Sequence, residues 1–169
     1  PSSRFGRIAK AKEEALIGLG SKSFEPVMLR AGFVYGPGER TRAPGYVREA
    51  SAHGGIRLVG RPLAFVPTTN VENLAHAAAL AIEAPRAAHG VYHVLDRELS
   101  TQVAFFGRYS IALELGLPRR GSSLFVERLR TRFGVGLDEG ELMRRGASGT
   151  LDARRARDEL GYEPVTSLE

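Results

Sequence analysis

The chain has 169 residues, enough to bury one substantial core but too few for two ordinary domains. Its hydrophobic content of 43% and charged content of 25% are those of a water-soluble globular protein, which excludes disordered and fibrous classes. It has no cysteine, and no apolar run approaches the roughly 20 residues of a membrane-spanning helix. We therefore expect a cytoplasmic protein without disulfides, a secretory signal or a membrane partner.

The formal net charge of +5 comes mostly from arginine, since Lys10, Lys12 and Lys22 are the only lysines. The arginines concentrate in the second half of the chain, which raises the question of nucleic-acid binding. Acidic residues are interspersed with them, aromatic residues are sparse there, and no nucleic-acid-binding motif accompanies the charge. The pattern favours a solvated arginine-rich surface and no nucleic-acid partner.

The first third of the chain alternates between helix and strand patterns. Apolar spacing predicts a helix over residues 8–19, which glycines end, followed by a buried strand over 27–29. A glycine- and proline-rich loop over 35–44 leads to a helix over 45–53, stopped by two glycines. Two short strands separated by a turn are then predicted over residues 56–59 and 63–66.

The next stretch continues the alternation. Thr69 and Glu72 have the spacing of a capping box, which predicts a helix that ends near Glu83. A second buried strand is predicted over 91–95, and Ser100 should cap a helix over 101–115. Beyond it the signal weakens, with short helices expected over residues 124–133, 139–145 and 152–160. Alternation up to residue 115 implies parallel strand pairing, and the remainder predicts a small, mostly helical lobe.

The segment from Leu29 to Gly38 is the most informative one. It passes from a buried-strand pattern into Tyr35-Gly36-Pro37-Gly38, a loop delivered to the carboxyl edge of the sheet, where open α/β sheets bind ligands. The segment resembles the "LRPGxVYGPG" signature of extended short-chain dehydrogenases/reductases, the group of NAD-dependent epimerases/dehydratases and 3β-hydroxysteroid dehydrogenase-like enzymes. Ala31 stands where that signature has proline.

Further segments resemble the same family in the same order. They are residues 54–60, 71–77, 90–94 and 151–164. The resemblance implies the carboxyl-terminal half of such an enzyme: an α/β fold with a partial Rossmann-like parallel sheet, flanking helices and a small, mainly helical C-terminal lobe. We expect residues 1–118 to form part of an NAD(P)-binding Rossmann-like domain and residues 119–169 to form a small substrate-lobe segment.

The resemblance also implies roles for individual residues. Residues 10–14 are similar to the family's "SKAxxE" helix, which implies that Lys10 holds the cofactor ribose and assists proton transfer. Phe33 and Val34 would line the nicotinamide ring of NAD or NADP. Tyr35, Arg40 and Arg61 would face a small-molecule substrate. From the residues alone, Lys10 is equally an ordinary solvated charge, and the loop a structural turn.

Two parts of the family's catalytic apparatus are missing. The tyrosine four residues before the lysine is Gly6 here, and the nearest aromatic residue, Phe5, cannot transfer a proton. No strand–helix unit carries the glycine-rich loop that binds a pyrophosphate. His89 and His93 have the four-residue spacing of a metal site on a helix, but Gly90 and the β-branched residues after it predict a strand there, which separates the two rings, so no metal site is expected.

Two functions stay open. The chain is either a fragment of an NAD(P)-dependent epimerase, dehydratase or dehydrogenase acting by hydride transfer on a nucleotide sugar or a sterol-like alcohol or ketone, or a non-catalytic remnant that self-associates. In both cases we expect this chain alone to be inactive and to bind no NAD or NADP. Because the family's catalytic helix commonly forms a dimer contact, a homodimer is expected.

Overall fold

A computed structural model describes residues 4–84, 87, 89–146 and 148–167, and of residues 4 and 5 only the backbone. Its central feature is a parallel arrangement of four strands: β1 (Met28–Ala31), β2 (Phe33–Tyr35), β5 (Thr68–Asn70) and β6 (Val91–Val94). β1 pairs in parallel with β6, and β2 pairs in parallel with β5. The predicted parallel pairing is therefore confirmed, whereas β5 was not among the predicted strands.

Gly32 separates β1 from β2 where the chain changes its pairing partner. Its amide donates to the Thr69 hydroxyl over 2.8 Å, and this hydroxyl donates to the Val94 carbonyl over 2.6 Å. A Cβ atom at Gly32 would collide with the Pro67 carbonyl, so the close approach requires glycine. Thr69 of β5 thus binds both β6 and the residue between β1 and β2, and the prediction that it caps the following helix is wrong. Asn70 is the cap instead, because its Oδ1 accepts from the Glu72 amide.

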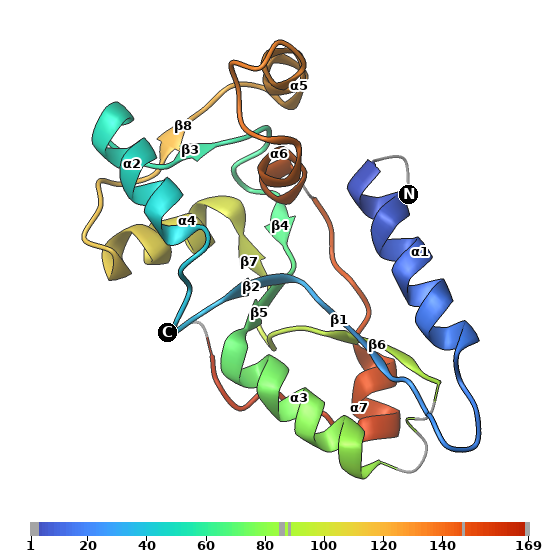
Figure 1. The fold of residues 1–169 in the computed structure, drawn as a ribbon. Coiled ribbons are helices and arrows are strands. Elements are labelled where there is room, and N and C mark those ends of the chain that lie inside the picture. The colour runs from blue at the N-terminus through green and yellow to red at the C-terminus, as the bar shows by residue number, and fades with distance from the viewer. Residues whose placement is uncertain (1–3, 85–86, 88, 147, 168–169) are drawn as a thin grey trace.

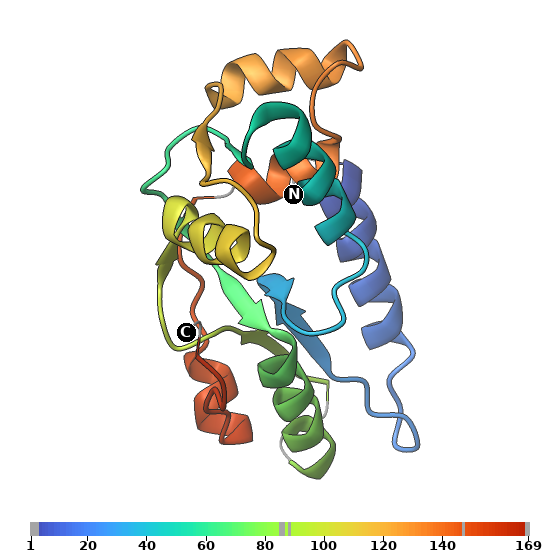
Figure 2. The ribbon, with the colours of Figure 1, turned by 90° about the vertical axis from the view of Figure 1, so that its left-hand side faces the viewer.

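Two helices cover one side of β1 and β6. They are α3 (Val71–Glu83), which agrees with its prediction, and the short α7 (Arg154–Leu160). Apolar side chains of both helices pack on the strands in one cluster, whose buried members are Ala77, Ala87, Tyr92, Val94, Ala156, Leu160 and Tyr162. α1 (Arg4–Gly18) lies on the other side of β1 from α3, and an ion pair between Glu13 and Arg30 joins it to the strand (Figures 1 and 2).

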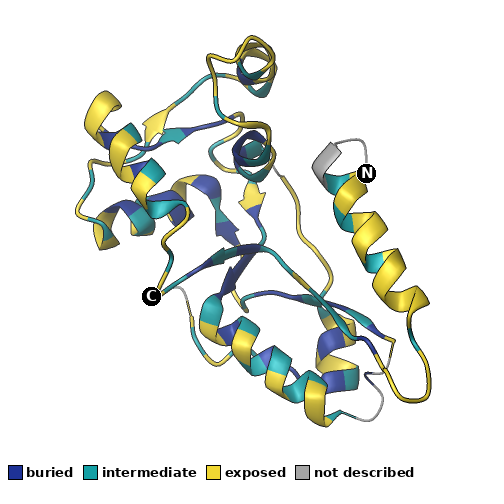
Figure 3. Ribbon diagram, in the orientation of Figure 1, coloured by how far each residue is buried: buried dark blue, intermediate teal, exposed yellow. Residues whose placement is uncertain are grey.

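A second cluster packs around α2 (Ala43–His53) and α4 (Gln102–Ala112). Its buried aromatic side chains meet edge to face, with 4.9 Å between the ring centres of Phe33 and Phe105 and 5.6 Å between those of Tyr46 and Phe106. The cap of α4 is Thr101, whose hydroxyl accepts from the Ala104 amide, and not Ser100 as predicted. In Figure 3 the buried residues of both clusters belong to the dark blue parts of the ribbon.

The remaining described elements are two pairs of short strands and two helices, and the division into a domain over residues 1–118 and a lobe over 119–169 stays a prediction. Short strands β3 (Arg57–Leu58) and β8 (Arg119–Arg120) pair in parallel, whereas β4 (Phe65–Val66) and β7 (Ser100–Thr101) pair antiparallel. β7 and β8 were not among the predicted strands, and the sequence pattern instead places Ser100 and Thr101 at the start of a helix. Helices α5 (Leu124–Arg132) and α6 (Glu139–Gly146) pack against each other near the positions predicted for them. None of the helices in the described ranges is long and apolar enough to cross a membrane.

Candidate functional site

The loop after β2 lies at the carboxyl edge of the parallel strands. Tyr35 at the end of β2 pairs in register with Asn70 at the end of β5, so the loop begins beside the N-terminus of α3. Gly36 and Gly38 have φ angles of 128° and 83°, a region that side chains other than glycine rarely adopt. A Cβ atom at Gly36 would also approach the Val71 side chain to 2.9 Å. The glycines therefore allow the chain to turn sharply at the sheet edge.

Arg42 connects this loop to α2. Its Nη1 donates to the Val34 carbonyl over 3.1 Å, and its guanidinium lies 5.1 Å from the centre of the Phe33 ring. Glu39 supports the turn, because its Oε1 accepts from the amides of Thr41 and Arg42. These contacts hold a cation directly over the end of β2.

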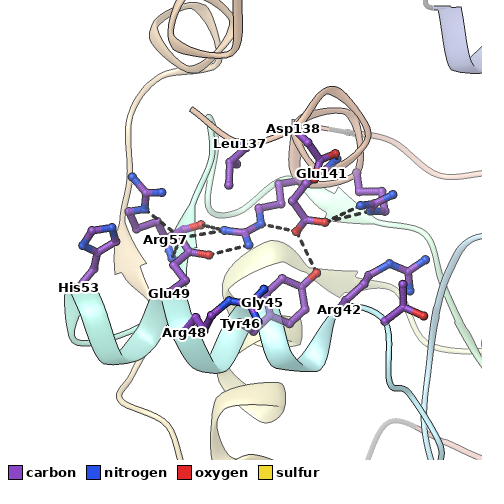
Figure 4. Close-up of a pocket in the computed structure, with 13 residues that line it drawn as sticks. Arg42, Gly45, Tyr46, Arg48, Glu49, His53, Arg57, Leu137, Asp138 and Glu141 are labelled. Atoms are coloured by element: carbon purple, nitrogen blue, oxygen red, sulfur yellow. Dashed lines mark hydrogen bonds and ion pairs between the residues drawn. The ribbon is translucent and has the colours of Figure 1, made fainter. Parts of the chain in front are cut away.

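Two cavities adjoin Arg42. The larger, of about 570 Å³, lies between α2 and α6 and is drawn in Figure 4. The smaller, of about 360 Å³, opens beside Gly32 and Phe33. Both have Arg42 and Arg144 in their walls, so they are neighbours across these two side chains. We call the larger one the arginine cavity after its basic residues, Arg42, Arg48, Arg57, Arg144 and Arg145.

Arg145 organises the wall of the arginine cavity. Its guanidinium, with its side chain 2% exposed, donates to Glu49 Oε2 over 2.7 Å, to Glu141 Oε1 over 2.6 Å and to the Arg57 carbonyl over 2.9 Å. It also lies 5.0 Å from the centre of the Tyr46 ring. Two carboxylates and a ring face thus hold one buried cation, which satisfies the requirement that a buried charge be paired.

The same contacts set the protonation states. Burial opposes the charge of Glu49, but hydrogen bonds from Arg145 and Arg57 outweigh it and lower the pKa of Glu49. Burial, and then the Glu141 carboxylate, raises the pKa of Tyr46, whose hydroxyl donates to Glu141 over 2.9 Å (Figure 4). Glu49 and Glu141 are therefore both paired with Arg145, and the lowered pKa of Glu49 favours its ionised form.

The balance of charge around the arginine cavity is positive. Five arginines outnumber the three carboxylates of Glu49, Asp138 and Glu141 in its lining. Arg48 is exposed on α2 and has no ion pair among the residues that the structure describes. A cavity of this size with a surplus of guanidinium groups is suited to an anionic small molecule, since guanidinium binds carboxylate and phosphate oxygens in pairs.

The structure separates the residues predicted to contact cofactor. Phe33 is buried in the aromatic cluster at 6% exposure, and Val34 points to the opposite side of β2 because side chains alternate along a strand. Lys10 is exposed on α1, where it pairs with Glu14 over 3.4 Å, and it lines none of the cavities described above. The side chain of Phe5 lies outside the described part of the chain.

The residues predicted to contact substrate are also dispersed. Tyr35 is buried at 8% exposure and lines a third cavity, of about 430 Å³, between the loop and α4. Burial, and then the nearby Asp96 carboxylate, raises the pKa of its phenol. Arg40 and Arg61 are exposed and belong to neither cavity beside Arg42. The roles assigned to these residues remain predictions.

Sequence reasoning missed the arginine cavity. Glu141, Arg144 and Arg145 have the spacing of helical ion pairs, and this signal was available. The decisive partner, Glu49, lies 96 residues from Arg145, and no local pattern indicates such a contact.

A dinucleotide cofactor does not fit the strand–helix turn between β5 and α3. The chain passes directly from Asn70 into the helix, without glycine, and Asp96 accepts from the Asn70 amide and the Asn73 side chain over 2.7 Å each. A carboxylate at this position repels phosphate. Within the described ranges, no group of three or more histidine, aspartate or glutamate side chains is placed to hold a metal ion.

Comparison with known proteins finds likeness in structure alone. No family model and no curated protein matches the sequence. Solved structures do match, among them MoeE5 in complex with UDP-glucuronic acid and NAD, with a TM-score of 0.67, 19% identity and coverage of 99% of this chain and 52% of the other. A dTDP-glucose 4,6-dehydratase from Bacillus anthracis in complex with NAD gives a TM-score of 0.65 and 15% identity, covering 99% and 49%.

A third match is the human epimerase family protein SDR39U1 with NADPH, which has a TM-score of 0.64, 20% identity and coverage of 89% of this chain and 48% of the other. This chain therefore spans about half the length of each of these structures.

Proposed function

Because the chain has the α/β, Rossmann-like fold of about half of an extended short-chain dehydrogenase/reductase of the epimerase/dehydratase group, we propose that it forms the substrate side of an NAD(P)-dependent epimerase, dehydratase or dehydrogenase. The complete protein would transfer a hydride between the nicotinamide and a carbinol carbon of a nucleotide sugar or, alternatively, a sterol-like alcohol or ketone. The chain alone would be inactive.

The arginine cavity is the observation that carries this proposal. It lies next to the loop at the carboxyl edge of β2, and Arg42 belongs to both. A nucleotide sugar carries phosphate groups that exposed guanidinium groups such as that of Arg48 bind well. The cavity favours this substrate class over a sterol-like alcohol, which offers no anionic group.

The proposal extends to the roles of individual residues. Val34 would face the nicotinamide, since it points to the open side of β2, and Phe33 would support it from the core. Lys10 would contact the ribose. Tyr35, Arg40 and Arg61 would contact the substrate. Arg42 and Arg48, which line the arginine cavity, would contact it as well.

The dinucleotide would bind to polypeptide outside this sequence. β1 pairs only with β6 in the part of the chain that the structure describes, so its other edge is available to a further strand. A cavity of about 720 Å³ lies beside β1, with apolar residues of α1, β1, α3 and the α1–β1 connection in its lining, among them Leu16, Phe24 and Leu29. Docking of the second half here would bury this apolar surface.

Calorimetry tests the proposal in two titrations. NADH added to the chain should give no binding heat. Micromolar affinity for NADH would contradict the proposal that the dinucleotide binds outside this sequence. UDP-glucuronic acid should bind, and R48Q should weaken its affinity about tenfold through loss of a charge-assisted hydrogen bond. The control R97Q removes another exposed arginine, which lines neither cavity beside Arg42, and should bind as the parent does. Equal affinity of both variants for UDP-glucuronic acid would exclude the arginine cavity as its binding site.

A second candidate function is a non-catalytic, self-associating module. Ile8, Leu16, Ile17 and Leu19 on or directly after α1 are between 37% and 66% exposed, which leaves much of the apolar surface of this helix in contact with water. A homodimer through α1 would cover it. Sedimentation should then show a dimer that L16S dissociates, whereas V165S, at a similarly exposed apolar site, should leave it intact.

A further inference from the structure

Helix α5 exposes apolar side chains and buries a charged one, the reverse of the pattern expected for a surface helix. Phe125 and Phe133, at its start and just after its end, are 75% and 70% exposed, whereas Glu127 between them is 3% exposed. A surface helix normally turns its apolar side chains inward and its charges outward. α5 lies at the outer end of the molecule, packed against α6, with its outer surface exposed (Figures 1 and 3).

The exposed apolar residues of α5 share one side of the helix. Phe125, Leu129 and Phe133 are spaced four residues apart, which places them in a row along a helical surface. Val135, 75% exposed, follows directly after the helix. We call these four residues the α5 face. An exposed apolar patch of this kind marks an interaction site more often than a scattered surface residue does.

The charge on α5 and in the segment just before it is mainly positive. Between Glu114 and Asp138 the sequence has five arginines and a single acidic residue, Glu127. Glu127 is buried and pairs with Arg130 over 3.0 Å, so it does not offset the others. Arg128 and Arg132 are exposed and border the α5 face, and β8 contributes Arg119 and Arg120 just before the helix.

We propose that the α5 face binds the surface of a membrane that contains anionic lipids. Phenylalanine and leucine enter the boundary between headgroups and acyl chains, while flanking arginines contact lipid phosphates. A second copy of the chain is a poor occupant, because matching α5 faces would bring their arginines together. The row projects from a convex helix, a shape suited to a soft lipid surface more than to the groove-and-helix contacts of peptide recognition.

This surface is independent of the proposed enzymatic function, since none of its residues lines the arginine cavity. It departs from the expectation of no membrane partner, which rested on the lack of a spanning segment. A helix that lies on a membrane surface needs no such segment. Each arginine near an anionic surface contributes about fivefold in affinity, and this share decreases as salt screens the charges.

Vesicle co-sedimentation of the chain tests the proposal. The chain should sediment with vesicles of phosphatidylcholine and phosphatidylglycerol at low salt, and much less with phosphatidylcholine alone. The double variant F125S/F133S should lose most binding, and R128Q/R132Q should lose about 25-fold. The controls I111S, at an apolar site 71% exposed on α4, and R97Q should bind as the parent does.

All the substituted side chains are exposed, so circular dichroism should show unchanged folding. Three results would overturn the proposal: no sedimentation of the parent chain, equal sedimentation with neutral vesicles, or equal losses in the controls. Loss of a dimer rather than of vesicle binding in F125S/F133S would identify the α5 face as a contact between copies. Binding of an acidic protein that vesicles do not compete away would identify a protein partner instead.

Discussion

The region around β6 and the region around Arg145 are stabilised by different interactions. Beside β6, the fully buried Tyr92 and Val94 contact small and apolar side chains of α3 and α7, such as Ala156 and Leu160. Between α2 and α6, one buried arginine connects Glu49, Glu141 and Tyr46. The first region distributes its stability over many contacts, whereas the second depends on a single cation.

The difference has consequences for function. Apolar packing gives the rigid support on which a loop at the sheet edge can be positioned. The ion network instead gives a wall of fixed charge, from which other guanidinium groups project into a cavity.

Removal of the central cation is the most severe test of this comparison. R145M should lower the free energy of unfolding by about 3 kcal/mol or more, because it leaves two buried carboxylates without their shared partner. Urea denaturation measures the change. The control R154M removes an arginine paired with Asp152 in full contact with solvent and should leave the midpoint unchanged. A small effect of R145M would show that Arg57 and Arg144 suffice to neutralise Glu49 and Glu141.

The apolar region also contains a buried polar side chain, Asn73, which sharpens the comparison. Asn73 is fully buried, and its side chain accepts from the amides of Val165 and Thr166 and donates to the Thr166 carbonyl and to Asp96. N73A should destabilise the chain by about 2 kcal/mol, since it leaves these buried groups unsatisfied. Hydrogen exchange should show faster exchange at residues 165 and 166.

The variant T166V provides the matched control for Asn73. It removes only an exposed hydrogen bond to Glu72 and should cost about 0.5 kcal/mol or less. If N73A and T166V lowered the free energy of unfolding equally, the buried hydrogen bonds of Asn73 would add nothing to the stability that the surrounding apolar packing provides.

The two regions also differ in how well sequence predicts them. α3 and β6 were placed within a residue of their ends, because apolar periodicity over neighbouring residues determines both. Arg145 was not singled out, since its partner lies 96 residues away and buried arginines are rare. Thr69 was assigned to a helix cap on local spacing, whereas contacts with Gly32 and Val94 decide its role. Local patterns predict elements, and only the assembled fold determines contacts between them.

Acid provides a milder test of the ion network. The pKa of Glu49 is lowered in the folded state from its ordinary value of 4.5, so its contribution to stability is complete above that value and decreases as pH falls through the folded pKa. The chain should therefore lose stability on acidification below about pH 4.5, and E49Q should weaken this dependence. Urea midpoints measured across this pH range test it. An unchanged acid dependence in E49Q would contradict the role of Glu49 in this pH dependence.

The smallest effect is expected at Lys10, which lies outside both regions. Its ion pair with Glu14 is exposed on both sides, and such pairs contribute about 0.5 kcal/mol or less. K10A should therefore leave the urea midpoint nearly unchanged, also because alanine favours helix. E13A should cost more, since Glu13 is the residue through which α1 holds Arg30 of β1. A large loss of stability in K10A would show that Lys10 is a structural residue, and would remove the reason to assign it to a cofactor.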